Sequence, residues 1–66
     1  MVITINGKPE EIKLQSNLAG LILSKGLCVD NLVIEYNSRI VPKREWEDIV
    51  LEENDTVEIV SFVGGG

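Results

Sequence analysis

The sequence of 66 residues is long enough for one small domain, and folding a chain of this size buries only about 60% of its unfolded surface. Six Lys and Arg against eleven Asp and Glu give a formal charge of −5, which argues against binding to the phosphates of a nucleic acid. The sequence has no histidine and one cysteine, Cys28. This composition disfavours a zinc site, a disulfide-stabilised domain and a self-sufficient enzyme.

The first residues predict a strand rather than a targeting signal. Met1, Ile3 and Ile5 alternate with the residues between them, at the period of a β-strand. A secretory signal would start with basic residues and a longer apolar run. No segment approaches the ~20 apolar residues that cross a membrane. We therefore expect a protein that does not bind membranes and lies in the cytoplasm or a comparable reducing compartment.

A hairpin and then a helix are predicted next. Asn6-Gly7 separates two alternating runs, which is a strong signal for a tight β-turn. The second run is expected to place Ile12 and Leu14 on one face, and Pro9 suits an edge strand.

The helix is predicted over Asn17 to Lys25, with Ser16 or Asn17 as its N-cap and Gly26 at its C-terminal end. Leu18, Leu21 and Ile22 fall on one face of that helix.

The remaining elements complete a single sheet. Residues 32–36 favour a strand, Ile40-Val41 a short strand, and 43–46 a helical turn in which Trp46 covers the core. Thr56 to Phe62 is expected to be the last strand, beside the first and inside the sheet. This order predicts an α+β protein of the β-grasp (ubiquitin-like) class, with four to five strands in a mixed sheet on one helix. Residues 1–63 form the domain, and the glycines 64–66 form a flexible C-terminal tail.

Most of the candidate chemistry of the side chains is weak. We expect Cys28 to be a small buried or half-buried residue, because no partner cysteine or neighbouring cation accompanies it. The carboxylates, including the run from Glu52 to Asp55, are expected to be mostly a solvated surface, with steering of a basic partner as the alternative. No P-loop is present, because the glycines 64–66 precede neither a helix nor a lysine.

The C-terminal strand carries a candidate docking surface. If Val57 and Ile59 face the helix, alternation places Glu58, Val60 and Phe62 on the opposite face of the sheet. An exposed aromatic residue next to an aliphatic one, just before the glycines, is a plausible contact for a partner; scattered apolar residues on a surface are the alternative.

These features together resemble the ThiS family of sulfur carrier proteins. The resemblance rests on Asn37 to Pro42, on Trp46, and on the ending from Val57 to Gly66, and it extends over essentially the whole chain. A terminal diglycine alone is shared by the wider ubiquitin-like group. The family often has Gly at the positions of Ser38 and Asn54, and neither difference affects the C-terminal glycines.

The resemblance implies a carrier rather than an enzyme. It implies that a ThiF-like adenylyltransferase uses MgATP to activate the Gly66 carboxylate, and that this chain binds no cofactor itself. Sulfur from a cysteine desulfurase or another donor then forms a thiocarboxylate, which supplies thiazole synthase, a ThiG-like partner, with the sulfur of the thiamine thiazole. The partner contacts are expected at Val60, Phe62, Val63, Gly64 and Gly65, and the reacting group at Gly66.

Two related functions remain open from the sequence. A sulfur carrier of molybdopterin synthesis has the same fold and activation chemistry, although such proteins are usually longer. A ubiquitin-like protein modifier would join Gly66 to lysines of target proteins. A third alternative is a β-grasp binding module whose terminal glycines have no function.

Overall fold

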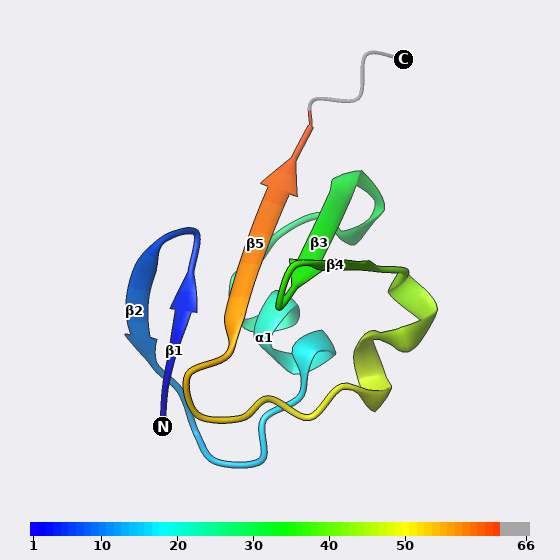
Figure 1. Ribbon diagram of the computed structural model, residues 1–66. Helices are drawn as coiled ribbons and strands as arrows, with labels where there is room; N and C mark the ends of the chain where they lie inside the picture. Colours follow the sequence, from blue (N-terminus) through cyan, green and yellow to red (C-terminus); the bar gives the residue numbers. More distant parts are fainter. Residues whose placement is uncertain (63–66) are drawn as a thin grey trace.

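The computed structural model describes residues 1–62, which form a sheet covered by a helix on one face (Figure 1). The strands are β1 (Val2–Ile5), β2 (Lys8–Glu11), β3 (Leu32–Tyr36), β4 (Arg39–Val41) and β5 (Thr56–Ser61). The α-helix is α1 (Leu18–Ser24), and two short 3-10 helices are η1 (Val29–Asn31) and η2 (Lys43–Asp48). In the part of the chain that is described, we find no helix long and apolar enough to span a membrane.

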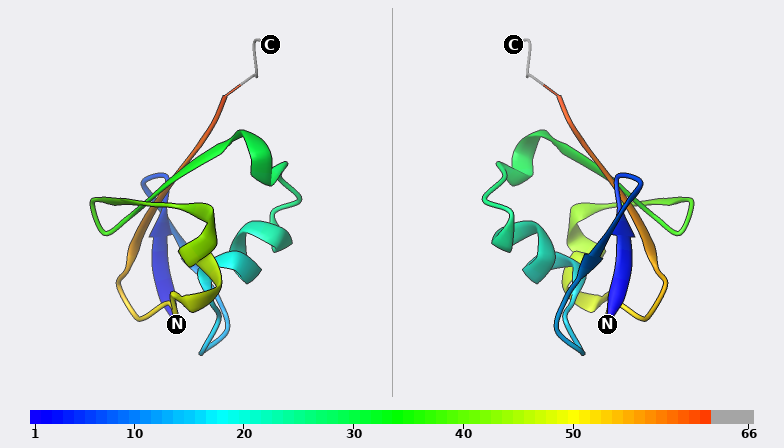
Figure 2. Two further views of the ribbon diagram at one scale, coloured as in Figure 1. Left: turned by 90° about the vertical axis from the view of Figure 1, so that its right-hand side faces the viewer. Right: turned by 90° about the vertical axis from the view of Figure 1, so that its left-hand side faces the viewer.

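The strand order in the sheet is β2-β1-β5-β3-β4. The last strand lies between the first and the third, parallel to β1 and antiparallel to β3. This confirms the position that the sequence predicted for the C-terminal strand. The sheet occupies one side of the molecule, whereas α1 and η2 lie on the other (Figure 2). A mixed five-stranded sheet around one main helix is the β-grasp fold.

The core fills the space between the sheet and α1. Its buried apolar residues come from every layer: Ile3, Ile5, Leu18, Leu21, Ile22, Ile34, Val41, Trp46, Leu51 and Val57. The predicted helical face of Leu18, Leu21 and Ile22 is confirmed. Trp46 lies in η2, and its indole Nε1 donates a hydrogen bond to the carbonyl of Val41 at 3.1 Å, which satisfies its polar atom.

Helix α1 begins and ends close to the predicted residues. Asn17 is the N-cap, and its Oδ1 accepts a hydrogen bond from the N–H of Gly20 at 2.7 Å. Gly26 has a φ of +70°, the left-handed conformation that commonly follows a helix. Short polar residues and glycine therefore fix both ends of a helix of only seven residues.

Left-handed residues make the tight turns. Asn6 and Gly7 connect β1 to β2 with φ of 51° and 81°. Asn37 and Ser38 connect β3 to β4 with φ of 48° and 72°, and Asn54 has a φ of 72° before β5. Ser38 and Asn54, where the family often has Gly, thus both adopt a conformation that glycine adopts at no steric cost.

The second strand is shorter than predicted. β2 ends at Glu11, and Leu14 is 75% exposed instead of sharing a strand face with Ile12. The chain turns after Ile12, where Ser16 Oγ donates to the carbonyl of Lys13 at 2.7 Å and Gln15 has a φ of 66°. Only Ile12 of the predicted pair packs against the core.

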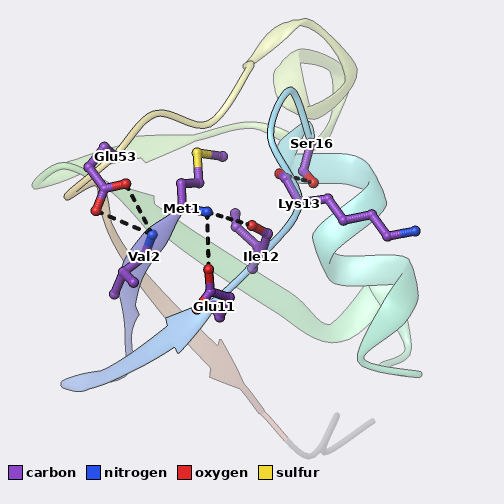
Figure 3. Close-up of polar contacts among 7 residues, drawn as sticks. All are labelled: Met1, Val2, Glu11, Ile12, Lys13, Ser16 and Glu53. Carbon is purple, nitrogen blue, oxygen red and sulfur yellow. Dashed lines mark hydrogen bonds and ion pairs between the residues drawn. The ribbon is translucent and has the colours of Figure 1, made fainter.

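The first residues hold this turn and β2 against the sheet (Figure 3). The amino group of Met1 donates to the carbonyl of Ile12 at 2.9 Å and lies 3.4 Å from a Glu11 carboxylate oxygen. The N–H of Val2 donates to both carboxylate oxygens of Glu53, each at 3.3 Å.

The prediction for Cys28 was wrong, and the prediction of a mostly solvated set of carboxylates has an exception at Asp55. Cys28 is exposed rather than buried, because it lies in the connection from α1 to η1, outside the core. Asp55 is only 8% exposed, so the run from Glu52 to Asp55 is not a uniformly solvated surface. Asp55 is buried because its carboxylate accepts hydrogen bonds from neighbouring turns, which alternation of apolar residues does not reveal.

Candidate functional site: the C-terminal end of β5

The candidate site lies where β5 leaves the sheet. β1 pairs only with Thr56 and Val57, whereas β3 pairs with β5 as far as Ser61. The last described backbone hydrogen bond of this strand runs from the N–H of Phe62 to the carbonyl of Asn31, at 3.0 Å. The end of β5 therefore extends past β1 and points away from the sheet (Figure 1).

One face of this end is apolar and exposed. Val60 is 56% exposed and Phe62 is 49% exposed, as the alternation along the strand predicted. Val33 lies directly opposite Val60 on β3, and Ile40 of β4 lies on the same face because it pairs with Glu35. We call these four apolar residues the outer patch: Val33, Ile40, Val60 and Phe62. An exposed apolar group of this kind is typical of a surface that binds another protein.

The sequence alone identified only half of the outer patch. Val60 and Phe62 were found because they belong to one strand and share its alternation. Val33 and Ile40 come from β3 and β4, and they join the patch through the register between strands, which the turn at Asn37 and Ser38 sets. Alternation with Ile34 and Val41, which are buried, is the sequence signal that could have found them.

The other end of β5 is fixed by a hydrogen-bond network around Asp55. Its Oδ2 accepts from the Tyr36 hydroxyl at 2.6 Å and from the N–H of Glu52 at 2.8 Å, and its Oδ1 accepts from Asn37 Nδ2 at 3.1 Å. Asn37 also bonds Thr56 twice, through its N–H and its Oδ1, each at 2.8 Å. This network connects the turn before β5 to the turn after β3.

The network shifts two pKa values. Burial alone would raise the pKa of Asp55, but hydrogen bonds from Tyr36, Asn37 and the Glu52 N–H favour the carboxylate, and the pKa of Asp55 lies below its ordinary value. Burial, followed by the hydrogen bond to Asp55 and its charge, raises the pKa of Tyr36 to about 12. Both shifts favour the protonation states that make the hydrogen bond, in which the Asp55 carboxylate accepts from the Tyr36 phenol. Their role is structural, because the network joins the turn before β5 to the turn after β3.

The remaining residues predicted for the site lie outside the described residues: Val63, Gly64, Gly65 and Gly66. Their contacts and the reactivity of the Gly66 carboxylate stay predictions. Among residues 1–62, no group of three or more His, Cys, Asp and Glu side chains is arranged to hold a metal ion.

Comparison with known proteins identifies the family. The model of the ThiS family matches residues 3–66. The chain belongs to the ThiS family. The sulfur carrier protein ThiS of Bacillus subtilis is 32% identical to it over 66 residues, which cover 98% of this chain and 100% of that protein.

Structural comparison leads to the same ThiS family. A crystal structure of the thiamine biosynthesis protein ThiS from Geobacter metallireducens superimposes with a TM-score of 0.85 and 25% identity, over 100% of both chains. A thiazole synthase from Magnetococcus marinus is 33% identical over 66 residues, which cover 100% of this chain. The chain spans 20% of the length of that thiazole synthase.

Proposed function

We propose that this protein is a sulfur carrier of thiamine biosynthesis and that the Gly66 carboxylate is the group that carries sulfur. The observation that carries the proposal is the match of the whole chain, from fold to glycine ending, to the ThiS family. The full-length similarity to the Bacillus subtilis sulfur carrier protein supports it further.

The proposed chemistry begins with activation. A carboxylate with a pKa of roughly 3.3–3.7 is ionised near neutral pH and is a poor electrophile. A ThiF-like adenylyltransferase would let a Gly66 oxygen attack the α-phosphorus of ATP, so that pyrophosphate leaves and an acyl adenylate forms. MgATP belongs to that enzyme. This chain is the substrate of the reaction and not its catalyst.

Sulfur transfer follows on the same carbonyl. A hydrosulfide, released by a thiol reductant from the persulfide of a cysteine desulfurase or supplied by another donor, forms a C–S bond and loses its proton while the C–O bond to AMP breaks. The resulting thiocarboxylate would donate its sulfur to thiazole synthase. The similarity of the entire chain to a segment of the Magnetococcus marinus thiazole synthase supports this partner, because it joins a carrier-like segment and a synthase in one polypeptide.

The geometry of β5 supports a carrier in which the folded domain is the part that partners bind. Val60 and Phe62 of the outer patch precede residues 63–66 in the sequence, so a partner that binds the patch would hold the strand that leads into the proposed reacting residue. We place the protein in the cytoplasm, since the single Cys28 has no second cysteine for a disulfide.

The test is intact mass spectrometry. The protein is incubated with a ThiF-like enzyme, MgATP, a cysteine desulfurase, cysteine and a thiol reductant, and its mass is compared with a sample that lacks ATP. We expect an ATP-dependent gain that corresponds to one oxygen exchanged for sulfur, localised to Gly66 by fragmentation. Conjugates to other proteins would instead indicate a protein modifier. An unchanged mass would overturn the proposal. Transfer of the sulfur to a purified thiazole synthase rather than to a molybdopterin synthase subunit would separate the two carrier types.

A further inference from the structure

Two carboxylates accompany the outer patch on the same face of the sheet. Glu35 of β3 lies directly opposite Glu58 of β5, two residues along each strand from the pair Val33 and Val60. Glu35 is also directly opposite Ile40 of β4, so the acidic pair lies between apolar residues of three strands. We call Glu35 and Glu58 the acidic pair.

Among residues 1–62, no Lys or Arg occupies a strand position on the same face as the acidic pair. Of the six Lys and Arg residues, only Lys8 and Arg39 lie in strands, and both pair with residues of the core side, Ile5 and Tyr36. The ion pairs found within residues 1–62 involve other carboxylates, and none involves Glu35 or Glu58. The outer face of the sheet is therefore apolar and negative.

We expect this arrangement to lower the stability of the isolated protein. Like charges directly opposite each other on antiparallel strands repel, and opposite charges at such positions stabilise the pair instead. If an apolar partner surface without a cation covered the outer patch, the two carboxylates would also lose their hydrating water without gaining a hydrogen bond or an ion pair. A partner with an Arg or Lys side chain opposite the acidic pair would relieve both penalties.

We propose that the acidic pair selects the adenylating enzyme, by receiving an Arg or Lys side chain that lies next to an apolar contact surface. This rests on the proposed function and identifies the chemistry of the partner surface. An enzyme that activates a carboxylate with ATP must surround the polyphosphate with cationic groups. Its surface near that site attracts an acidic face, which raises the association rate and makes binding depend on salt.

The experiment measures affinity and stability together. Wild type, Glu35→Gln, Glu58→Gln and the double variant are titrated calorimetrically with the ThiF-like enzyme of the same organism, at low and at physiological salt. We expect the double variant to bind about tenfold more weakly or worse, with a smaller salt dependence. Its Tm should rise, because the repulsion is removed. The matched control is Glu47→Gln, since Glu47 is exposed in η2 on the helix side and should change neither quantity.

The outcomes distinguish this inference from the proposed function. Unchanged affinity and salt dependence in the double variant would overturn the inference, while sulfur exchange on the wild type would leave the proposed function intact. A fall in Tm would also overturn it, since the carboxylates would then support the fold. Weaker binding to thiazole synthase alone would refute the assignment to the adenylating enzyme. If the wild type neither binds nor is adenylated, both proposals fail.

Discussion

At its first residues β5 lies between two strands, whereas at its last residues it has a neighbouring strand on one side. Val57 pairs with both β1 and β3, Thr56 pairs with β1, and Asp55 connects the preceding turn to Tyr36 and Asn37. From Ile59 onward the contact on the β1 side is a side chain: Asn6 Oδ1 accepts the Ile59 N–H at 2.7 Å. One strand thus combines a fixed beginning, which serves stability, with an accessible end, which can serve a partner.

The largest expected effect lies beyond the accessible end. We predict that Gly65→Val abolishes adenylation while the Tm stays unchanged, because a β-branched side chain widens the segment that enters the active site and restricts its φ and ψ. Gly65→Ala should give an intermediate rate. Pyrophosphate release by the ThiF-like enzyme measures adenylation, and thermal unfolding measures the Tm. Wild-type rates in Gly65→Val would contradict a narrow channel for the glycines.

At the fixed beginning, the largest effect should be on stability. Asp55→Ala removes the acceptor for Tyr36, Asn37 and the Glu52 N–H, and we expect a loss of about 3 kcal/mol in the free energy of unfolding. Urea denaturation measures this loss. The control Asp48→Ala, at an exposed position, should change stability by less than about 0.5 kcal/mol. At a temperature where the variant is folded, adenylation should proceed normally, and a specific loss of activity would show that the two ends of β5 are coupled.

A substitution in the outer patch is expected to have the next largest effect, on binding to the adenylating enzyme. We predict that Phe62→Asp weakens binding to the adenylating enzyme by about tenfold or more, the range of a residue central to an interface, with little change in Tm. The matched control is Leu23→Asp, since Leu23 is 78% exposed on α1, on the other side of the molecule. Equal losses for the two variants would indicate a general effect of charge rather than a contact at Phe62.

The pH dependence of stability sharpens the same comparison. The lowered pKa of Asp55 means that its contribution is present above the ordinary pKa of an unfolded Asp, about 3.9, and is lost as the pH falls through the lower folded value. The raised pKa of Tyr36 adds stability that is present below about pH 10 and is lost as the pH rises through about 12. The Tm difference between wild type and Asp55→Asn should therefore shrink in acid. A constant difference down to pH 2 would show that the charge of Asp55 does not matter.

The smallest expected effect is at the turn between β3 and β4. Ser38 has a φ of 72°, where a Cβ atom is strained, and we predict that Ser38→Gly raises the free energy of unfolding by about 0.5–1 kcal/mol. Ser38→Ala keeps the Cβ atom and should give no gain. Chemical denaturation of the wild type, Ser38→Gly and Ser38→Ala measures these differences. A loss of stability in Ser38→Gly would mean that the serine side chain stabilises the turn.

Local signals predicted the elements of the fold well. Asn6-Gly7 and Asn17 were read correctly because a turn and a helix cap depend on neighbours in the sequence. The outward direction of Val60 and Phe62 followed from the period of one strand.

Features that join distant segments were missed. The burial of Asp55 requires Tyr36, nineteen positions away, and the acidic pair requires the register between β3 and β5. Cys28 was misplaced because the connection after α1 runs along the surface, although apolar residues flank it.

The burial of Trp46 has a practical consequence for these experiments. It is the only tryptophan in the sequence, it is 4% exposed, and it lies in η2, on the opposite side of the sheet from the outer patch (Figure 2). Its fluorescence should change when the core opens and stay constant when a protein covers the outer face. The native chain thus contains an optical reporter of unfolding that needs no label and is insensitive to docking.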